Sequence, residues 1–386
     1  MDSRQIISLT GLRRVGKTTI MLKLVEDYLA KFGKDNIVYF SFDDFRETTI
    51  RDIIKAYSEL MSRDTRKGKY LFLLDEIQKV EGWEEQIKRE YDQNPDIKFV
   101  ISGSESLFIR KKTRESLAGR MYEFQINALN FREYLRFKGK KFDNIALYEE
   151  EISKEFHNFL FCNGFPEIVH EGPEIIEKYI KESIVEKIIY RDIPQMLQVR
   201  EPATLWQILR IILMDPGEII NLGELAGGLG ISRQTASIYL DYLEKSFLVK
   251  KLYNFSRNAR KTERKFKRYY PAIILPELAR KSEMFGKVFE TFMVLQLNAE
   301  FFWRDQYKNE VDVIMIDGSE IVPIEITSSK IDYRPLRLFM KKFKLAKGIV
   351  ISYSKKEHLN LDGRSIKIIP FYEYLLAGNM EEIIKK

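Results

Sequence analysis

Short apolar runs alternate with stretches of helical spacing over the first 130 residues of the chain. After the first run, for example, Leu22, Val25 and Leu29 share one side of a predicted helix. Strands that alternate with helices predict an α/β fold with a doubly wound parallel sheet, which binds ligands at the carboxyl ends of its strands. The predicted strands cover residues 5–10, 36–42, 69–76 and 97–104.

The apolar spacing becomes helical from residue 130 onward, and a Gly-Phe-Pro break precedes a long predicted helix over residues 175–197. An amphipathic helix at 205–213 is followed by a helix, a glycine turn and a helix that Ser232 would cap. This order is the helix-turn-helix layout. The apolar run at 248–253 then begins a pair of strands.

Two alternating runs near the C-terminus flank the dipeptide Asp317-Gly318, which is a strong hairpin signal. If these two residues form the turn, Glu310, Asp312 and Glu325 share one face, with Glu325 directly opposite Glu310. Opposed carboxylates repel each other unless a cation lies between them, so this face predicts a metal site or a nearby lysine. Two further strands are predicted at 349–352 and 366–370.

The segment Gly11–Thr18 fits G-x-x-x-x-G-K-[ST], the phosphate-binding P-loop, and lies between a predicted strand and a predicted helix. The phosphates of a nucleotide would lie on the free N–H groups at the helix start, where the helix dipole favours anions. Lys17 would reach the terminal phosphates and Thr18 would hold Mg²⁺. The predicted nucleotide-binding residues in this region are Gly11, Leu12, Arg13, Arg14, Val15, Gly16, Lys17, Thr18 and Thr19.

Two carboxylates, Asp75 and Glu76, end a continuous apolar run that is typical of a strand buried on both faces of a parallel sheet. Asp75 would bind Mg²⁺ through water, and Glu76 would orient and polarise the attacking water. Together with the P-loop, they predict hydrolysis of ATP with the help of Mg²⁺. The predicted catalytic residues are Lys17, Asp75 and Glu76.

Composition narrows the class of protein. A length of 386 residues is too great for one core and predicts about three domains. No apolar run reaches the roughly 18 residues of a membrane span, and the N-terminus lacks the layout of a signal peptide. Cys162 stands alone, which excludes a disulfide and favours the reducing cytoplasm. With one cysteine and three histidines, the sequence favours a Mg²⁺-like metal over zinc.

The formal net charge of +7 is modest, but the charge is unevenly distributed. Residues 257–268 contain seven cations and one carboxylate, and between two strands they would form a basic wing along a phosphate backbone. Polar residues at the start of the second helix of the helix-turn-helix suit the major groove of double-stranded DNA. Winged helices also bind proteins, so a protein partner is the alternative. The predicted DNA-binding residues are Ser232, Arg233, Gln234, Arg257, Arg260, Lys261, Arg264 and Lys265.

Four segments resemble a prokaryotic family of AAA+ ATPases that is especially common in archaea. They are residues 11–19, 73–78, 102–104 and 116–120. Members of this family follow the ATPase core with a helical lid, a winged helix and a nuclease-like C-terminal domain. The resemblance implies a P-loop ATPase core at 1–130, a helical lid and connector at 131–202, a winged helix at 203–272 and a nuclease-like domain at 273–386.

The resemblance also implies roles for single residues. In AAA+ proteins a polar side chain at the end of the strand over 97–104 contacts the γ-phosphate or the attacking water, and here Ser104 or Ser102 would do so. Arg114 or Arg120 would be an arginine finger on a neighbouring subunit, or a surface salt bridge. The lid would pack over the nucleotide and move on hydrolysis. Because AAA+ proteins often form rings, a homo-oligomer is also considered.

An acidic pattern in the last third of the chain resembles the PD-(D/E)xK fold, which implies an α/β domain of the restriction-endonuclease type. In that fold two carboxylates hold Mg²⁺ and a lysine helps to position the attacking water. Thr327 stands where that lysine belongs, so Lys308 or Lys330 would have to supply the ammonium. The implied nuclease residues are Glu290, Asp312 and Glu325, of which the last two would form a second metal site.

We therefore expect a cytoplasmic ATPase that works as a nucleotide-driven switch or motor on double-stranded DNA, which it would hold through its winged helix. One alternative is a signalling ATPase whose winged helix and C-terminal domain bind protein partners. The other is a Mg²⁺-dependent DNA nuclease regulated by ATP. No membrane partner is expected.

Overall fold

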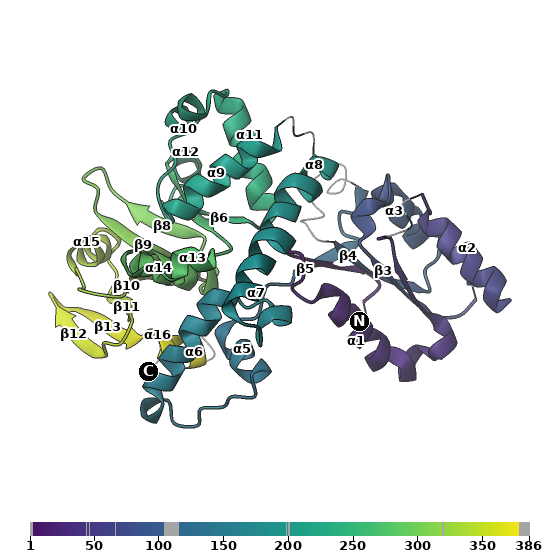
Figure 1. Ribbon diagram of the computed structural model, residues 1–386, viewed down its shortest axis with the longest axis horizontal. Coiled ribbons are helices and arrows are strands. Elements are labelled where there is room, and N and C mark those ends of the chain that lie inside the picture. Colours follow the sequence, from purple (N-terminus) through teal and green to yellow (C-terminus); the bar gives the residue numbers. More distant parts are fainter. Residues whose placement is uncertain are drawn as a thin grey trace. The chain divides into compact units, whose positions relative to one another are not determined.

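The computed structural model describes residues 3–43, 45, 47–65, 67–103, 116–197, 199, 201–318 and 320–377. The chain divides into two units (Figure 1). The first comprises Met1–Ala128 with Lys245–Phe247, and the second comprises Leu129–Glu244 with Leu248–Lys386. Within the described ranges, no helix has both the length and the apolar composition that a membrane span requires.

A parallel sheet in the order β2-β3-β4-β1-β5 forms the centre of the first unit. Its strands are β1 (Ile6–Thr10), β2 (Ile37–Ser41), β3 (Tyr70–Asp75), β4 (Ile97–Gly103) and β5 (Met121–Gln125). The first four confirm the predicted strands, and β5 was not predicted. Among the described residues of the first unit, the helices of ten or more residues are α1 (Lys17–Phe32), α2 (Ile50–Met61) and α3 (Trp83–Gln93).

Strand β3 shows how both faces of this sheet are covered. Leu71 and Leu73 pack in one apolar cluster with residues of α1, whereas Phe72 and Leu74 pack in another with residues of α2 and α3. Figure 1 shows α1 on one side of the sheet and α2 and α3 on the other. All of β3 is buried, and the burial of each of its leucine and phenylalanine side chains stabilises the fold by about 1.5–3 kcal/mol relative to exposure.

The inner face of α1 differs from the predicted one. Leu22 and Leu29 are 50% and 42% exposed, whereas Met21 is buried. The P-loop sets the rotation of the helix, because it turns Lys17 inward, and a residue four positions later lies on the same face. Residues Ile20, Leu24, Val25, Tyr28 and Phe32 complete the contact with the sheet.

The second unit begins with helices. They are α5 (Phe131–Phe137), α6 (Glu149–Cys162), α7 (Pro173–Lys178), the π-helical segments η6 (Tyr179–Glu186) and η7 (Ile188–Asp192), and α8 (Ile193–Met196). The stretch from α7 to α8 confirms the predicted long helix and begins two residues earlier than expected, at a proline that suits a first helical turn.

Three helices and an antiparallel hairpin follow. They are α9 (Pro202–Met214), α10 (Leu222–Leu229), α11 (Arg233–Lys245), β6 (Val249–Asn254) and β7 (Lys267–Pro271). The predicted order of a helix, a turn and a second helix is confirmed. Asn221 caps α10, and the Ser232 hydroxyl accepts a hydrogen bond from the Thr235 amide at 3.0 Å. The hairpin connection contains a short helix, α12 (Ala259–Arg264).

The hairpin belongs to a larger mixed sheet of eight strands in the order β12-β13-β11-β10-β9-β8-β6-β7. Strand β6 pairs in parallel with β8, with Tyr253 beside Phe301. The sheet therefore runs across residue 272, where we expected one domain to end. The remaining elements are α13 (Pro276–Ala279), α14 (Phe285–Gln296), β8 (Phe301–Arg304), β9 (Glu310–Asp317), β10 (Glu320–Thr327), α15 (Arg334–Phe343), β11 (Lys347–Ser352), β12 (Glu357–Leu361), β13 (Arg364–Pro370) and α16 (Phe371–Ala377).

The register of the β9–β10 hairpin corrects the predicted one. Asp317 pairs with Glu320, so the turn begins at Gly318, which takes the left-handed φ of 56° that the turn requires. The ladder runs to Val313 opposite Ile324. Continued by one more pair, this register sets Asp312, rather than Glu310, opposite Glu325. Moving each strand by one residue keeps the three carboxylates on one face of the hairpin.

Candidate nucleotide site and carboxylate cluster

The P-loop connects β1 to α1 in a shape that requires small residues. A Cβ atom at Gly11 would collide with the carbonyl oxygen of Ile126, which follows the end of β5. Gly16 has a φ of 100° and precedes the first helical residue, Lys17. The loop therefore delivers its backbone and the amino end of α1 to the carboxyl edge of the sheet, as the sequence predicts.

Lys17 is held by the loop that precedes it. Its side chain is only 5% exposed, and Nζ donates hydrogen bonds to the carbonyl oxygens of Gly11 at 3.0 Å and Leu12 at 2.8 Å. An ammonium buried at the amino end of a helix adds a full charge to the partial positive charge of the helix dipole. This arrangement suits the terminal phosphates of a nucleotide.

Asp75 lies where side chains from three other elements meet. Its Oδ2 atom accepts hydrogen bonds from Thr18 Oγ1 at 2.7 Å and from the Tyr39 hydroxyl at 2.9 Å. Its Oδ1 atom accepts one from Ser102 Oγ. The structure therefore brings together both residues predicted to hold Mg²⁺, Thr18 and Asp75. Sequence reasoning missed Tyr39, because in an apolar strand a tyrosine looks like an ordinary core residue.

Glu76 follows β3 in a left-handed conformation, with a φ of 56°. Its amide donates to Ser102 Oγ at 3.1 Å, and its Oε2 atom accepts a hydrogen bond from Gln78 Nε2 at 2.6 Å. Burial raises the pKa of Glu76. The positive charge of Lys17 lowers this pKa and the negative charge of Asp75 raises it further, so that the net shift is upward. A carboxylate with a raised pKa beside a cation is suited to accept a proton from water. Gln78 was not predicted.

Ser102 occupies the polar position at the end of β4 that the family resemblance assigned to Ser104 or Ser102. Ser104 and Arg114 lie outside the described residues. Arg120 forms a two-pronged ion pair with Asp92, with N–O distances of 3.0 and 3.3 Å. This favours the salt-bridge interpretation of Arg120 over the arginine finger.

The residues at this edge fit a nucleotide with Mg²⁺. The P-loop backbone and Lys17 offer donors and positive charge, and Thr18 and Asp75 offer the hard oxygen ligands that Mg²⁺ takes alongside phosphate. Glu76 carries the second carboxylate that hydrolysis needs. The nucleotide-binding role of the other loop residues stays a prediction.

A carboxylate cluster in the second unit contains Glu290, Asp312 and Glu325, the three residues of the nuclease resemblance. It also contains an arginine that we had placed on the wing. Arg268 of β7 is only 9% exposed. Its Nη1 atom lies 3.4 Å from Asp312 Oδ1 and 3.7 Å from Glu290 Oε1, and its Nη2 atom bonds Glu310. The prediction of Arg268 as part of a phosphate-binding tip was wrong, because β7 turns its side chain into the sheet.

Burial shapes the protonation of this cluster. It raises the pKa of Glu290 to about 7, with the charge of Asp312 adding to the effect. Burial also raises the pKa of Glu325 well above its ordinary range. The Glu325 Oε2 atom is buried and has no hydrogen-bond partner among the residues described. Tyr270 donates its hydroxyl to Glu290 at 2.7 Å.

The arginine supplies the positive charge for which the sequence predicted a metal or a lysine. Among the described side chains, no group of three or more His, Cys, Asp or Glu is arranged to hold a metal ion. Lys308 precedes β9 and Lys330 follows β10, and both are exposed. The second Mg²⁺ site at Asp312 and Glu325 stays a prediction, and Arg268 would compete with the metal there.

The residues predicted to touch DNA fall into two groups. At the start of α11, Ser232, Arg233 and Gln234 are exposed, and the Arg233 guanidinium lies over Gly223 of α10.

In the β6–β7 connection, Arg260 and Lys261 are exposed, whereas Arg257 and Lys265 are partly engaged by the protein. Arg257 Nη2 donates to the Phe343 carbonyl at 3.1 Å, and Lys265 Nζ donates to the Phe255 carbonyl at 3.2 Å. The side chain of Arg264 lies outside the described ones.

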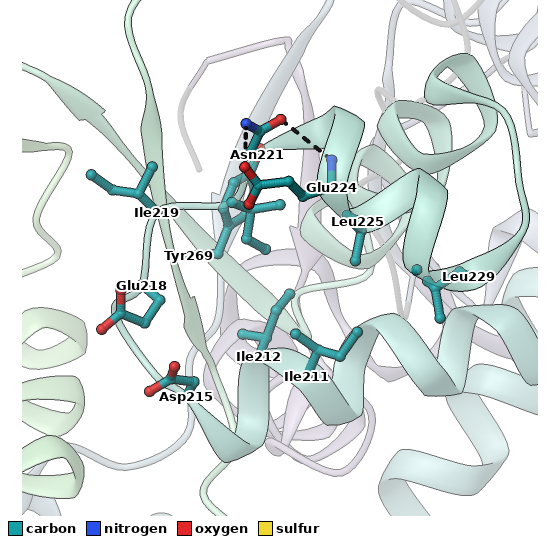
Figure 2. A pocket seen from close by; sticks show the side chains of 12 residues that line it. Ile211, Ile212, Asp215, Glu218, Ile219, Asn221, Glu224, Leu225, Leu229 and Tyr269 are labelled. Carbon is teal, nitrogen blue, oxygen red and sulfur yellow. Dashed lines mark hydrogen bonds between the residues drawn. The ribbon is translucent and has the colours of Figure 1, made fainter.

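A pocket of about 390 Å³ lies between α9, α10 and β7. Figure 2 shows apolar side chains of α9 and α10 lining it, with Asp215, Glu218 and Glu224 around them. Asp215 is paired with Lys287, and the side-chain amide of Asn221 donates to Glu224 at 3.0 Å. The pocket contains none of the residues predicted to bind DNA or nucleotide.

Comparison with protein families places an ATPase domain in the first unit. Residues 3–135 match the sequence model of an AAA domain. This part of the chain is therefore an AAA-type P-loop domain, which implies nucleoside triphosphatase activity. Residues 153–272 and 285–374 match two domains of unknown function, DUF8612 and DUF4143. These two descriptions state no activity.

The similar full-length proteins are uncharacterized. One from Methanocaldococcus jannaschii is 28% identical, over 95% of this chain and 87% of its own length. A second from that archaeon is 27% identical, over 97% and 85%. One from Haemophilus influenzae is 26% identical, over 84% and 83%. The similarity to these three proteins thus extends over most of the chain.

Solved structures give weaker likenesses. Domain III of the replication initiation protein DnaA from Thermotoga maritima is 10% identical with a TM-score of 0.27, over 47% of this chain and 85% of its own. PCH-2 of C. elegans is 13% identical with a TM-score of 0.27, over 63% and 61%. At such scores these likenesses support no statement about function.

Proposed function

We propose that this protein hydrolyses ATP in its first unit and uses the nucleotide cycle as a switch or motor on double-stranded DNA held by its second unit. The observation that carries the ATPase proposal is the convergence of Lys17, Thr18 and Asp75 at the carboxyl edge of the parallel sheet. Thr18 and Asp75 come from different elements, yet their oxygens are 2.7 Å apart.

Each residue has a role in this proposal. Lys17 binds the terminal phosphates and neutralises charge that develops in the transition state. Thr18 and Asp75 hold Mg²⁺, which supplies electrostatic stabilisation of the phosphates. Glu76 orients the attacking water and accepts its proton, and Gln78 and Ser102 fix the position of Glu76. Ser102 also fixes Asp75, so one hydroxyl supports both carboxylates.

The DNA part of the proposal rests on the second unit. The exposed polar start of α11 follows a helix and a turn, and an antiparallel hairpin with exposed Arg260 and Lys261 comes next. This is the order of a winged helix, in which one helix enters the major groove and the hairpin connection lies along phosphates. The net charge of +7 adds a long-range attraction for DNA.

The test is the ATPase rate of the full chain and of Lys17→Ala, with and without duplex DNA, at low and high salt. We expect a Lys17-dependent rate that DNA stimulates and that loses this stimulation as salt rises. Lys23→Ala is the matched control, because Lys23 is an exposed lysine of the same helix with only surface ion pairs. A rate that ignores Lys17 would contradict the ATPase site.

The second candidate is a signalling ATPase whose second unit binds a protein partner. The pocket between α9 and α10 favours it, because apolar walls with a carboxylate rim suit an apolar segment that carries a basic side chain. A Lys17-dependent ATPase rate that duplex DNA leaves unchanged at low salt would favour this candidate over the first.

A further inference from the structure

Helix α15 presents a basic surface in the second unit. Between Arg334 and Lys344 the chain contains five cations and no carboxylate. Leu336, Phe339 and Met340 are buried under the helix. The cations Lys341, Lys342 and Lys344 at its C-terminal end are exposed. This helix packs on β9 and β10 and so belongs to the sheet rather than to the helix-turn-helix.

The end of α15 is joined to the β6–β7 connection by direct contacts. The rings of Phe255 and Phe343 lie 5.3 Å apart, centre to centre. The Arg257 guanidinium lies over the Phe343 ring at 5.6 Å and also donates to the Phe343 carbonyl at 3.1 Å. Residues 255–257 and the last turn of α15 are thus fixed to each other in one unit.

The cations of the β6–β7 connection and those at the end of α15 are close enough to affect one another's charge. Burial lowers the pKa of Lys265, and the charges of Lys342 and Lys261 lower it further. Lys342 belongs to α15 and Lys261 to α12, so both helices bring positive charge to the same place. The Lys342 ammonium lies 5.2 Å from the centre of the Trp303 ring, which supports it at the surface.

Nearby carboxylates neutralise only part of this charge. Asp362 pairs with Arg337 on the preceding part of α15 and also attracts Lys341. Asp305 attracts Lys342 and accepts hydrogen bonds from the amides of Tyr307 and Asn309. The exposed cations at the end of α15 and on α12 outnumber these two carboxylates, so the surface keeps a net positive charge. Such a surface attracts a polyanion with regularly spaced charges, which is the electrostatic character of duplex DNA.

We propose that the phosphate backbone of duplex DNA is bound by one composite surface, made of Arg260 and Lys261 of α12 together with Lys341, Lys342 and Lys344 at the end of α15. This inference rests on the proposed DNA-binding function and extends it. The duplex would run from the hairpin connection onto the helix that covers the eight-stranded sheet. The sheet domain would then be part of the DNA-binding platform.

The experiment measures duplex affinity by fluorescence anisotropy over a series of salt concentrations, with the full chain. The test variant is Lys341→Gln with Lys344→Gln, and Gln retains good helix propensity. The matched control is Lys154→Gln with Lys181→Gln, two exposed lysines on other helices of the same unit. Thermal unfolding midpoints within a few degrees of the wild-type value would establish that both double variants are folded.

Each phosphate contact that is lost lowers the slope of log K against log salt by about 0.9. We expect the α15 variant to lower the slope by roughly 1.8, twice that figure, and the control variant to leave it unchanged. A wild-type slope in the α15 variant, with a reduced slope in Arg260→Gln with Lys261→Gln, would overturn the composite surface and leave the DNA-binding proposal intact. No duplex binding by the wild type would overturn both.

Discussion

Thr18 Oγ1 lies 2.7 Å from Asp75 Oδ2, which joins the first turn of α1 to the end of β3. The two residues are 57 positions apart in the chain, and the parallel sheet brings them together because the carboxyl ends of its strands share one edge. In the proposed ATPase, these two oxygen-bearing side chains would hold Mg²⁺ together with the nucleotide.

Lys17→Ala should weaken ATP binding. The ammonium would make charge-assisted hydrogen bonds to the terminal phosphates, each of which contributes roughly 1.5–3 kcal/mol, so we expect a loss of about 10- to 100-fold in affinity. Fluorescence titration with a labelled ATP analogue measures this. Lys23→Ala should bind like the wild type, and equal affinities of all three proteins would show that Lys17 does not reach the phosphates.

Glu76→Gln should bind ATP and stall hydrolysis, because the amide keeps the size of the side chain but cannot accept a proton. General-base catalysis contributes roughly 10²- to 10⁴-fold, and kcat should fall by that factor while ATP affinity stays near the wild-type value. Steady-state ATPase assays with a parallel binding titration separate the two quantities. Normal turnover in Glu76→Gln would mean that another residue activates the water.

Ser102→Ala should destabilise the first unit and lower kcat. The hydroxyl bridges Asp75 Oδ1 and the amide of Glu76, and its loss leaves a buried donor unpaired, at a cost of about 1–3 kcal/mol. Urea unfolding gives the change in free energy. The control is Ser8→Ala in β1, whose buried hydroxyl has no partner within the described structure. Equal unfolding free energies for the two variants would contradict the bridging role.

Glu290 should make the second unit less stable as pH rises. Its pKa is raised from an ordinary value of 4.5 to about 7, so between these values the folded state keeps a proton that the unfolded state has lost. Stability contributed by this group is therefore complete below pH 4.5 and is lost as pH rises to 7. The total is at most roughly 3 kcal/mol. Denaturant unfolding at pH 5 and pH 8 should show a fall that is smaller in Glu290→Gln.

The C-terminal cluster should not cleave DNA. Arg268 occupies the space between Glu290, Glu310 and Asp312, and the lysine of the nuclease pattern is replaced by Thr327. Supercoiled plasmid incubated with the protein and Mg²⁺ or Mn²⁺ should stay supercoiled to the same extent as with Asp312→Ala. Nicking by the wild type that Asp312→Ala abolishes would restore the nuclease alternative.

Local signals made the P-loop, strand β3 and the start of α11 predictable. A few consecutive residues are enough to indicate each of these features, and the structure contains all three. A buried strand of a parallel sheet also has a distinctive composition, so β3 could be recognised before its neighbours were known. The edge strand β5 has four exposed residues out of five and carries no such signal.

What the sequence could not supply were contacts between distant residues. Arg268 and Asp312 are 44 positions apart, and nothing in the basic stretch distinguishes the one arginine that turns inward. The register of β9 and β10 depended on a turn that starts one residue later than the Asp-Gly pair suggested. Tyr39 lies 36 positions before Asp75, so it could be assigned to the site only once β2 was placed beside β3. Gln78 lies only two positions after Glu76, but nothing in the sequence indicates that its side chain turns back to that carboxylate.

The contact between Gly11 and Ile126 has a mechanical consequence. Ile126 donates its amide hydrogen to the Thr10 carbonyl at 2.7 Å, and its own carbonyl lies where a side chain at Gly11 would be, so the start of the P-loop and the end of β5 are packed against each other. Two residues later the first unit ends, at Ala128. The main chain that leaves the first unit at this point is therefore held, two residues earlier, by the residue that precedes the first glycine of the P-loop.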